Sequence, residues 1–250
     1  MIDVAARIAL GPMLLAQASA LRATAMQLPE AAGERSGRIG SGEPVLRLLI
    51  AGDSSAAGVG VATQDEALAL PLAQHLARRV AGGVRWQLLA QSGLTSEGIF
   101  EKLQASAVEA ADLAVVICGV NDITHQRPIR DSLFVRGQIV DWLRRHRGAR
   151  HVVFPALPEM EKFPSLKNPL AWYAGQLSRR NNHAQARWAA SRAHISHAQM
   201  DGIADSTLFA EDGYHPGPVL YARVAERLAD HIMKRAWGDL RTAAPVDTQT

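Results

Sequence analysis

The chain has 250 residues, of which 48% are hydrophobic and 20% are charged, and its formal net charge is +3. This balance supplies enough apolar surface for a sizeable core and excludes the composition of a disordered chain. The single cysteine, Cys118, excludes an intramolecular disulfide and a cysteine-based metal cage. The nine histidines show no familiar ligand spacing, so we expect neither a metal ion nor a cofactor.

We expect residues 1–44 to form an N-terminal apolar helix and a linker. Residues 8–20 are apolar, but they contain Gly11 and Pro12 and are too short to span a bilayer. The expected helix therefore packs on the following domain or makes peripheral contact with a membrane surface. The linker after it, residues 29–44, is rich in glycine and charge.

A cleaved signal peptide is the alternative interpretation of residues 1–25. Arg7 lies before the apolar run and the small residues 18–20 follow it, although Asp3 weakens the positively charged region. The preferred helix predicts a cytoplasmic or peripheral membrane location, whereas the signal peptide predicts secretion.

The first strong strand signal is the apolar run Val45–Ile50, which is short and is followed by Gly52. Ser54 therefore lies just beyond the carboxyl end of a strand, where ligands bind at the edge of an open parallel sheet. A serine at such a turn presents its hydroxyl and its backbone N–H outward, so Ser54 is a candidate nucleophile. The alternative is that residues 53–55 only cap the next helix.

Two more apolar runs, residues 85–90 and 113–118, predict further strands. Asn121 follows the second run, and its side-chain amide can donate to an oxyanion there. Its alternative role is an Asx turn. Gly93 follows the first run and offers either a bare backbone N–H or only a permissive turn.

The remaining elements alternate between helices and strands, which predicts an α/β domain with a parallel sheet. They are a helix from Pro71 to Gly82, a helix over residues 131–146, strands over 151–154 and 193–198, and a helix over 219–237. The last helix has an apolar stripe that is typical of core packing.

Prolines interrupt residues 155–172, so we expect a loop over the carboxyl edge of the sheet. Its apolar side chains are candidates for an acyl or alcohol pocket, with packing of the loop on its own domain as the alternative. These side chains are Phe163, Leu166, Leu170 and Trp172.

A candidate base follows near the C-terminus, because a serine hydroxyl needs a neighbour that accepts its proton and histidine has a suitable pKa. His215 is that candidate. Asp212 lies three residues earlier, close enough to receive the imidazole Nδ1–H and leave Nε2 for Ser54. The alternative is a turn at Asp212-Gly213 followed by a helix that opens at His215-Pro216.

With these segments in chain order, the sequence resembles the SGNH hydrolases, also called the GDSL esterase and lipase family, over roughly residues 45–233. Gly52-Asp53-Ser54 matches the first block, Gly93 the second, Gly119 with Asn121 the third, and Asp212 with His215 the fifth. The resemblance implies a three-layer α/β/α domain of the flavodoxin-like kind.

The resemblance also implies the role of each site residue. Ser54 is the nucleophile, His215 the base and Asp212 the acid that orients it. The Ser54 N–H, the Gly93 N–H and the Asn121 amide form the oxyanion hole. Residues 91–94 lack the asparagine that is often seen in the second block, so Gly93 is matched by its glycine alone.

The implied activity is hydrolysis of a carboxylic ester, of short to medium acyl length, through an acyl-enzyme. The same triad also serves thioesterases, lysophospholipases and carbohydrate acetyl esterases, and a non-catalytic binding domain is the distant alternative. Residues 52–60 lack the glycine-rich nucleotide motifs.

We place the catalytic domain at residues 45–238, because a split between Ser54 and His215 would separate the triad, and we expect residues 239–250 to form a disordered tail. The arginine clusters lie mostly near predicted helix ends, where cations suit the helix dipole. The resemblance implies a small-molecule ester as the partner, and we expect no nucleic acid.

Overall fold

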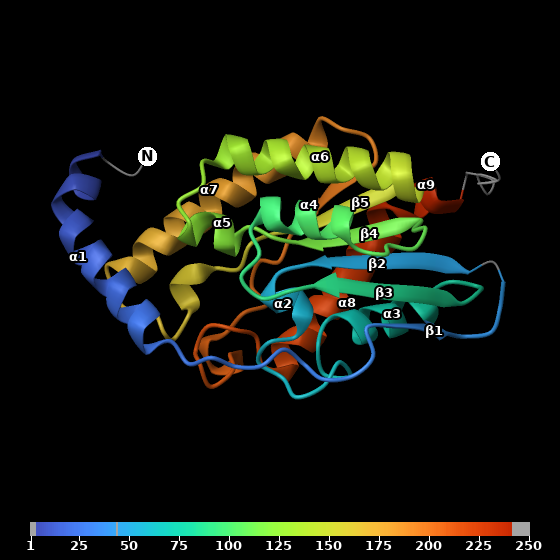
Figure 1. Cartoon of the computed structure of the whole chain (residues 1–250), viewed down its shortest axis with the longest axis horizontal. Helices are drawn as coiled ribbons and strands as arrows, with labels where there is room; N and C mark the ends of the chain where they lie inside the picture. The colour runs from blue at the N-terminus through green and yellow to red at the C-terminus, as the bar shows by residue number, and fades with distance from the viewer. Residues whose placement is uncertain (1–3, 44, 242–250) are drawn as a thin grey trace.

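The computed structural model describes residues 4–43 and 45–241, and its centre is one mixed sheet (Figure 1). The strands are β1 (Ser36–Ile39), β2 (Leu46–Gly52), β3 (Val84–Ala90), β4 (Leu113–Ile117), β5 (His151–Pro155) and β6 (Ile195–Ala198). Their order is β1-β3-β2-β4-β5-β6, with β1 antiparallel to β3 and the other neighbours parallel. The five strands expected from apolar runs are all present.

Helices cover both faces of this sheet, as Figure 1 shows. The helices are α1 (Val4–Thr24), α2 (Ser54–Ala57), α3 (Ala69–Ala77), α4 (Ser96–Ala105), α5 (Val120–Thr124), α6 (Ile129–Arg147), α7 (Leu170–Ala190), α8 (Pro218–Arg235) and α9 (Trp237–Arg241), with short 3₁₀ turns η1 (Met160–Lys162) and η2 (Ser206–Leu208). Strand residues alternate between two cores: Leu48 and Ile50 face α3 and α8, whereas Leu49 and Ala51 face α4 and α6. The predicted three-layer α/β/α architecture is confirmed.

The parallel strands have the order of a flavodoxin-like sheet, because β2 lies between β3 and β4 and the chain then continues outward to β5 and β6. The direction of winding therefore changes between β2 and β4. Ligands bind at the carboxyl ends of the strands at such a switch point. Ser54 follows β2 and Asn121 follows β4, so the fold itself brings the first and third motifs together.

The expected linker over residues 29–44 is wrong in part, because it contains β1. Residues Ser36 to Ile39 pair with β3, and Ala31 is buried. The sequence of β1 is polar and three of its four residues are exposed, so it carries no apolar alternation. The sheet thus begins before residue 45.

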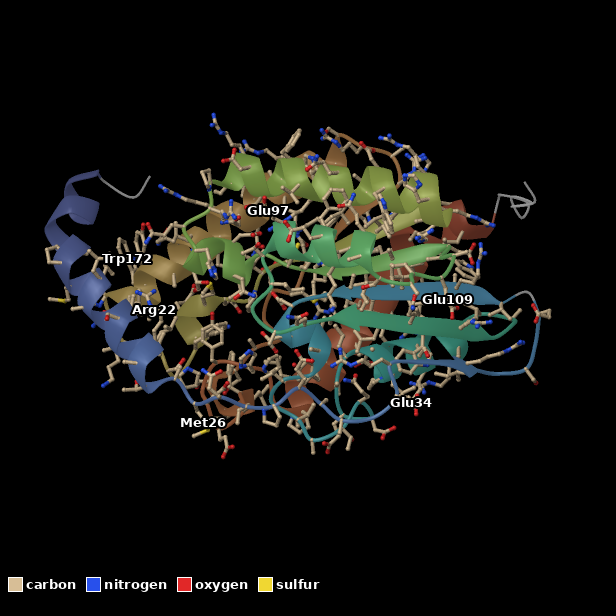
Figure 2. All side chains as sticks on the ribbon, viewed as in Figure 1. Arg22, Met26, Glu34, Glu97, Glu109 and Trp172 are labelled. Atoms are coloured by element: carbon tan, nitrogen blue, oxygen red, sulfur yellow. The ribbon has the colours of Figure 1, made fainter. Side chains whose placement is uncertain are left out.

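The two ends of the chain also differ from the expected boundaries. Residues 239–241, expected in the tail, belong to α9, and residues 242–250 lie outside the described residues. The expected N-terminal helix is present as α1, which meets α7 at one end of the molecule, where Figure 2 shows Trp172.

One side chain fastens α1 to the body of the protein. Gln17 Nε2 donates to the carbonyl of Asn168 at 2.9 Å, and the Leu170 N–H donates to Gln17 Oε1 at 3.1 Å. Met13 and Leu15 of the same helix are more than half exposed. No described helix is long and apolar enough to cross a membrane. Peripheral membrane contact through α1 remains a prediction, as does the signal peptide.

Candidate active site

Ser54 is the first residue of α2, directly after the buried strand β2. The turn between them needs Gly52, since a Cβ there would lie 2.6 Å from the Ile117 carbonyl oxygen. Asp53 caps α2 by accepting the Ser55 N–H at 3.1 Å, so the capping role falls to the aspartate. The Ser54 hydroxyl does not cap the helix and is therefore available to another partner. The backbone N–H of Ser54, in the first turn, has no acceptor inside the helix.

That partner is His215. His215 Nε2 lies 2.8 Å from Ser54 Oγ, and His215 Nδ1 lies 2.6 Å from Asp212 Oδ2. With Nδ1–H donating to the carboxylate, Nε2 is free to accept the serine proton. The structure therefore brings the three predicted triad residues into one continuous chain of hydrogen bonds.

The Asp212 carboxylate also builds the loop that holds His215. Its Oδ1 accepts the backbone N–H groups of Tyr214 at 2.9 Å and of His215 at 3.0 Å. Burial favours the protonated acid, but the hydrogen bonds from the His215 ring and from these two N–H groups prevail and lower the pKa of Asp212. The turn proposed as the alternative role does exist, and it serves to orient the imidazole. The next helix, α8, begins at Pro218.

Asn121 lies in the first turn of α5, beyond β4. One hydrogen of its Nδ2 is donated to the Leu94 carbonyl at 3.0 Å, and the other remains available to a ligand. Asn121 and Ser54 both line one cavity. Gly93 lies in the exposed loop between β3 and α4 with φ +82°, and it is not among the residues lining the cavity. An oxyanion role for Gly93 remains a prediction.

The cavity beside Ser54 has a volume of about 120 Å³ and a largely apolar wall. The segment before η2 and the helix α8 supply part of this apolar wall, together with two phenylalanine rings: Met200, Ile203, Ala204, Leu220, Val224, Phe163 and Phe209. Cys118 also lines it, but burial raises the pKa of this thiol to about 11, so the thiol stays protonated and does not compete as a nucleophile.

The expected pocket loop is confirmed only in part. Of its four candidate side chains, Phe163 lines the cavity, whereas Leu166, Leu170 and Trp172 are not among the lining residues. Leu166 packs beside Phe163, and Trp172 is 39% exposed. Leu170 begins α7 at its contact with α1. Leu170 and Trp172 thus belong to the long helix α7 and not to a loop.

A second serine, histidine and aspartate array was not anticipated from the sequence. His151 Nε2 lies 2.9 Å from Ser196 Oγ, and His151 Nδ1 lies 3.0 Å from Asp239 Oδ2. His231 Nε2 also contacts Ser196 Oγ, at 2.8 Å. His151 is the first residue of β5, so this array lies toward the amino ends of the strands, away from Ser54, and none of it lines the cavity.

The half-buried His231 should make the fold sensitive to acid. Burial, together with the neighbouring His151, Arg235 and His197, lowers the pKa of His231 to about 4, whereas an unfolded histidine titrates near 6.5. The unfolded chain thus binds the proton first, so the contribution of His231 to stability is lost as the pH falls from about 6.5 towards 4.

Denaturant unfolding of the wild type and of His231→Gln at several pH values between 7 and 4 measures this effect. Asp53 acts in the opposite direction, since burial raises its pKa to about 7. We therefore compare the two proteins with each other. Between pH 7 and pH 4, the free energy of unfolding should fall less in His231→Gln than in the wild type. Parallel pH curves for both would contradict the assignment.

Two comparisons with known proteins match most of this chain. The model of the GDSL-like lipase/acylhydrolase family matches residues 50–223. A relative, the GDSL-like esterase Rv1075c of Mycobacterium tuberculosis, is 30% identical over 196 residues, which cover 73% of this chain and 60% of that relative.

Solved structures show the same fold at lower identity. The structure titled TesA is 22% identical with a TM-score of 0.59, over 78% of this chain and 98% of that chain. A carbohydrate esterase family 2 enzyme with a carbohydrate binding domain, from Corynascus thermopiles, is 17% identical with a TM-score of 0.58, over 84% of this chain and 69% of that chain.

Proposed function

Because this chain belongs to the GDSL-like lipase/acylhydrolase family of carboxylic ester hydrolases, we propose that it is a serine esterase whose acyl-enzyme forms on Ser54. The observation that carries the proposal is the chain of hydrogen bonds from Ser54 Oγ through His215 to Asp212 beside an apolar cavity. A nucleophile, a base and an orienting acid in this order are the parts that acyl transfer requires.

In the first half of the reaction, Ser54 Oγ attacks the ester carbonyl while His215 Nε2 takes the hydroxyl proton. The bond to the alcohol oxygen then breaks, and His215 returns the proton to that oxygen. In the second half, water attacks the acyl-enzyme while His215 takes a proton from the water. The bond between the acyl carbon and Ser54 Oγ then breaks, His215 returns the proton to Oγ, and the acid leaves. Asp212 holds the imidazole in the productive tautomer throughout.

The negative charge that develops on the carbonyl oxygen needs donors that are already in place. The Ser54 N–H and the second Nδ2 hydrogen of Asn121 are suitable, because neither has an acceptor among the residues that the structure describes. The Gly93 N–H is the third donor in this proposal. Such donors stabilise the transition state more than the bound substrate.

An acyl chain of short to medium length fits the cavity better than a sugar does, because the wall is mostly apolar and side-chain donors are few. We place the acyl chain between α8 and the segment that contains Ala204, and the alcohol toward solvent. The same triad serves thioesters and lysophospholipids, so the assays below keep p-nitrophenol as the leaving group and vary the acyl chain alone.

Ala204→Phe should shorten the preferred acyl chain. Each methylene removed from water stabilises binding by about 0.8 kcal/mol, so the loss of two buried methylenes lowers kcat/KM about tenfold. We expect p-nitrophenyl octanoate to be affected and p-nitrophenyl acetate to be nearly unchanged. Ala193→Phe, at an exposed turn before β6, is the matched control. Equal losses on both esters would place the acyl chain elsewhere.

The experiment that tests the proposed function is reaction of the purified protein with a fluorophosphonate, followed by peptide mass spectrometry and ester assays. We expect the adduct on Ser54 and loss of turnover in proportion to labelling. A folded protein with neither an adduct nor turnover would instead favour a non-catalytic binding domain.

A further inference from the structure

Arg136 is a fully buried arginine on α6, at the side of the site where Asn121 lies. Its Nη2 donates to Asp122 Oδ2 at 3.1 Å, its Nε donates to Ser96 Oγ at 3.3 Å, and its Nη1 donates to Gln185 Oε1. A buried charge is costly unless it is paired and hydrogen-bonded. The three acceptors must therefore stay in place around the guanidinium, and with them the helices α5, α4 and α7 that carry them.

Asp122 and Ser96 join the two segments that carry the proposed oxyanion donors. The Asp122 carboxylate accepts the Ser96 N–H at 2.9 Å and the Ser96 hydroxyl at 2.5 Å. Ser96 starts α4 after the Gly93 loop, and Asp122 follows Asn121 in α5. Together with the bond from Asn121 to Leu94, three hydrogen bonds fasten one loop to the other.

The guanidinium also explains the glycine of the third motif. Gly119 has φ +124°, and a Cβ there would lie 2.7 Å from Arg136 Nη2 and 2.9 Å from Leu157 Cδ1. Arg136 thus packs against the backbone turn between β4 and α5. Through Gln185, whose Nε2 donates to the Pro155 carbonyl at 2.9 Å, it reaches the end of β5 as well.

We propose that Arg136, acting through Asp122 and Ser96, is a positioning residue for the oxyanion side of the site. The inference rests on the proposed function, since it concerns donors to an ester oxyanion. Oxyanion donors are effective only when they are held in place before charge develops, and small displacements are costly. Loss of the hydrogen bonds that join the Asn121 segment to the Gly93 segment should therefore slow the chemical step more than it weakens substrate binding.

Arg136→Met tests this when kcat is expressed per active Ser54, counted by fluorophosphonate labelling. We expect kcat per labelled site to fall about 10- to 100-fold, with KM changed less than about threefold. Arg136→Lys should recover part of the loss, because it keeps the charge and loses the planar fork. Normalising to labelled sites removes the effect of a smaller folded fraction.

Arg47→Met is the matched control, because it breaks another arginine–aspartate pair at the amino end of β2, where Arg47 contacts Asp112 at 2.7 Å and 3.0 Å. This variant should lose stability and keep wild-type kcat per labelled site. If Arg136→Met does not fold, Ser96→Ala removes only a hydroxyl from the same tie and should lower kcat severalfold with KM unchanged.

Unchanged kcat per labelled site in Arg136→Met, or in Ser96→Ala where the former does not fold, would overturn the positioning role. A loss of equal size in Arg47→Met would do the same, since it would show a general effect of stability. Failure of the proposed function looks different, because the wild type itself would then show no label on Ser54 and no ester turnover.

Discussion

Ser54→Ala should lower ester turnover by about 10⁴-fold or more while leaving the midpoint of thermal unfolding nearly unchanged. The Ser54 hydroxyl contacts the His215 ring, whereas the cap of α2 is supplied by Asp53. Removal of one oxygen therefore deletes the nucleophile without removing a structural bond of the helix. Any residual rate would come from the oxyanion donors and substrate binding.

Ser196→Ala is the matched control for this variant, because Ser196 also contacts a histidine that is paired with an aspartate. That array lies toward the amino ends of the strands and lines no part of the cavity, so its loss should leave turnover unchanged. Initial rates on p-nitrophenyl butanoate, with thermal scans of all three proteins, measure both expectations. Substantial turnover in Ser54→Ala, or its loss in Ser196→Ala alone, would move the nucleophile away from Ser54.

The strands could be predicted because a parallel sheet is buried on both faces and leaves continuous apolar runs. β2 begins and β4 ends one residue from the predicted boundaries at Val45 and Cys118. The turns after these strands lie at the same sheet edge whatever the helices between them do. Ser54 and Asn121 could therefore be placed together from the sequence, and His215 followed from the chemical need for a base.

The helix α7 was not predicted because it carries no apolar stripe. Its buried positions are small or polar, and they include Gly175, Ser178, Asn181 and Gln185. Two of these polar side chains bind carbonyl groups outside the helix, because Ser178 donates to the Pro158 carbonyl at 2.6 Å and Gln185 donates to the Pro155 carbonyl at 2.9 Å. Hydrophobic periodicity does not detect a helix held in this way.

The burial of Arg136 was not predicted for a related reason, since an arginine in a helix usually faces solvent. A signal was nevertheless present, because Arg136 shares the helix face of Ile139, Val140 and Leu143, which are buried. A charged residue on an apolar stripe indicates a buried partner. That partner, Asp122, lies in the third motif next to Asn121, where sequence reasoning assigned no role to it.

Asp212→Asn should lower kcat about 10³- to 10⁴-fold with little change in KM or stability. The asparagine keeps Oδ1 as the acceptor for the Tyr214 and His215 N–H groups, so the loop that carries His215 should persist. In place of Oδ2, however, it presents an NH₂ group to His215 Nδ1. Nδ1 must then accept, and the ring proton moves to Nε2, where it faces Ser54 and blocks proton transfer.

Asp212→Ala separates orientation of the imidazole from support of the loop, because it removes both acceptors at once. We expect it to lose turnover as well and, unlike Asp212→Asn, to lower the melting temperature. The measurement is kcat and KM near neutral pH together with the rate of fluorophosphonate labelling, which should slow in both variants since it also needs the base. Turnover in Asp212→Asn within tenfold of the wild type would mean that another group sets the His215 tautomer, and the carboxylate would then serve the loop alone.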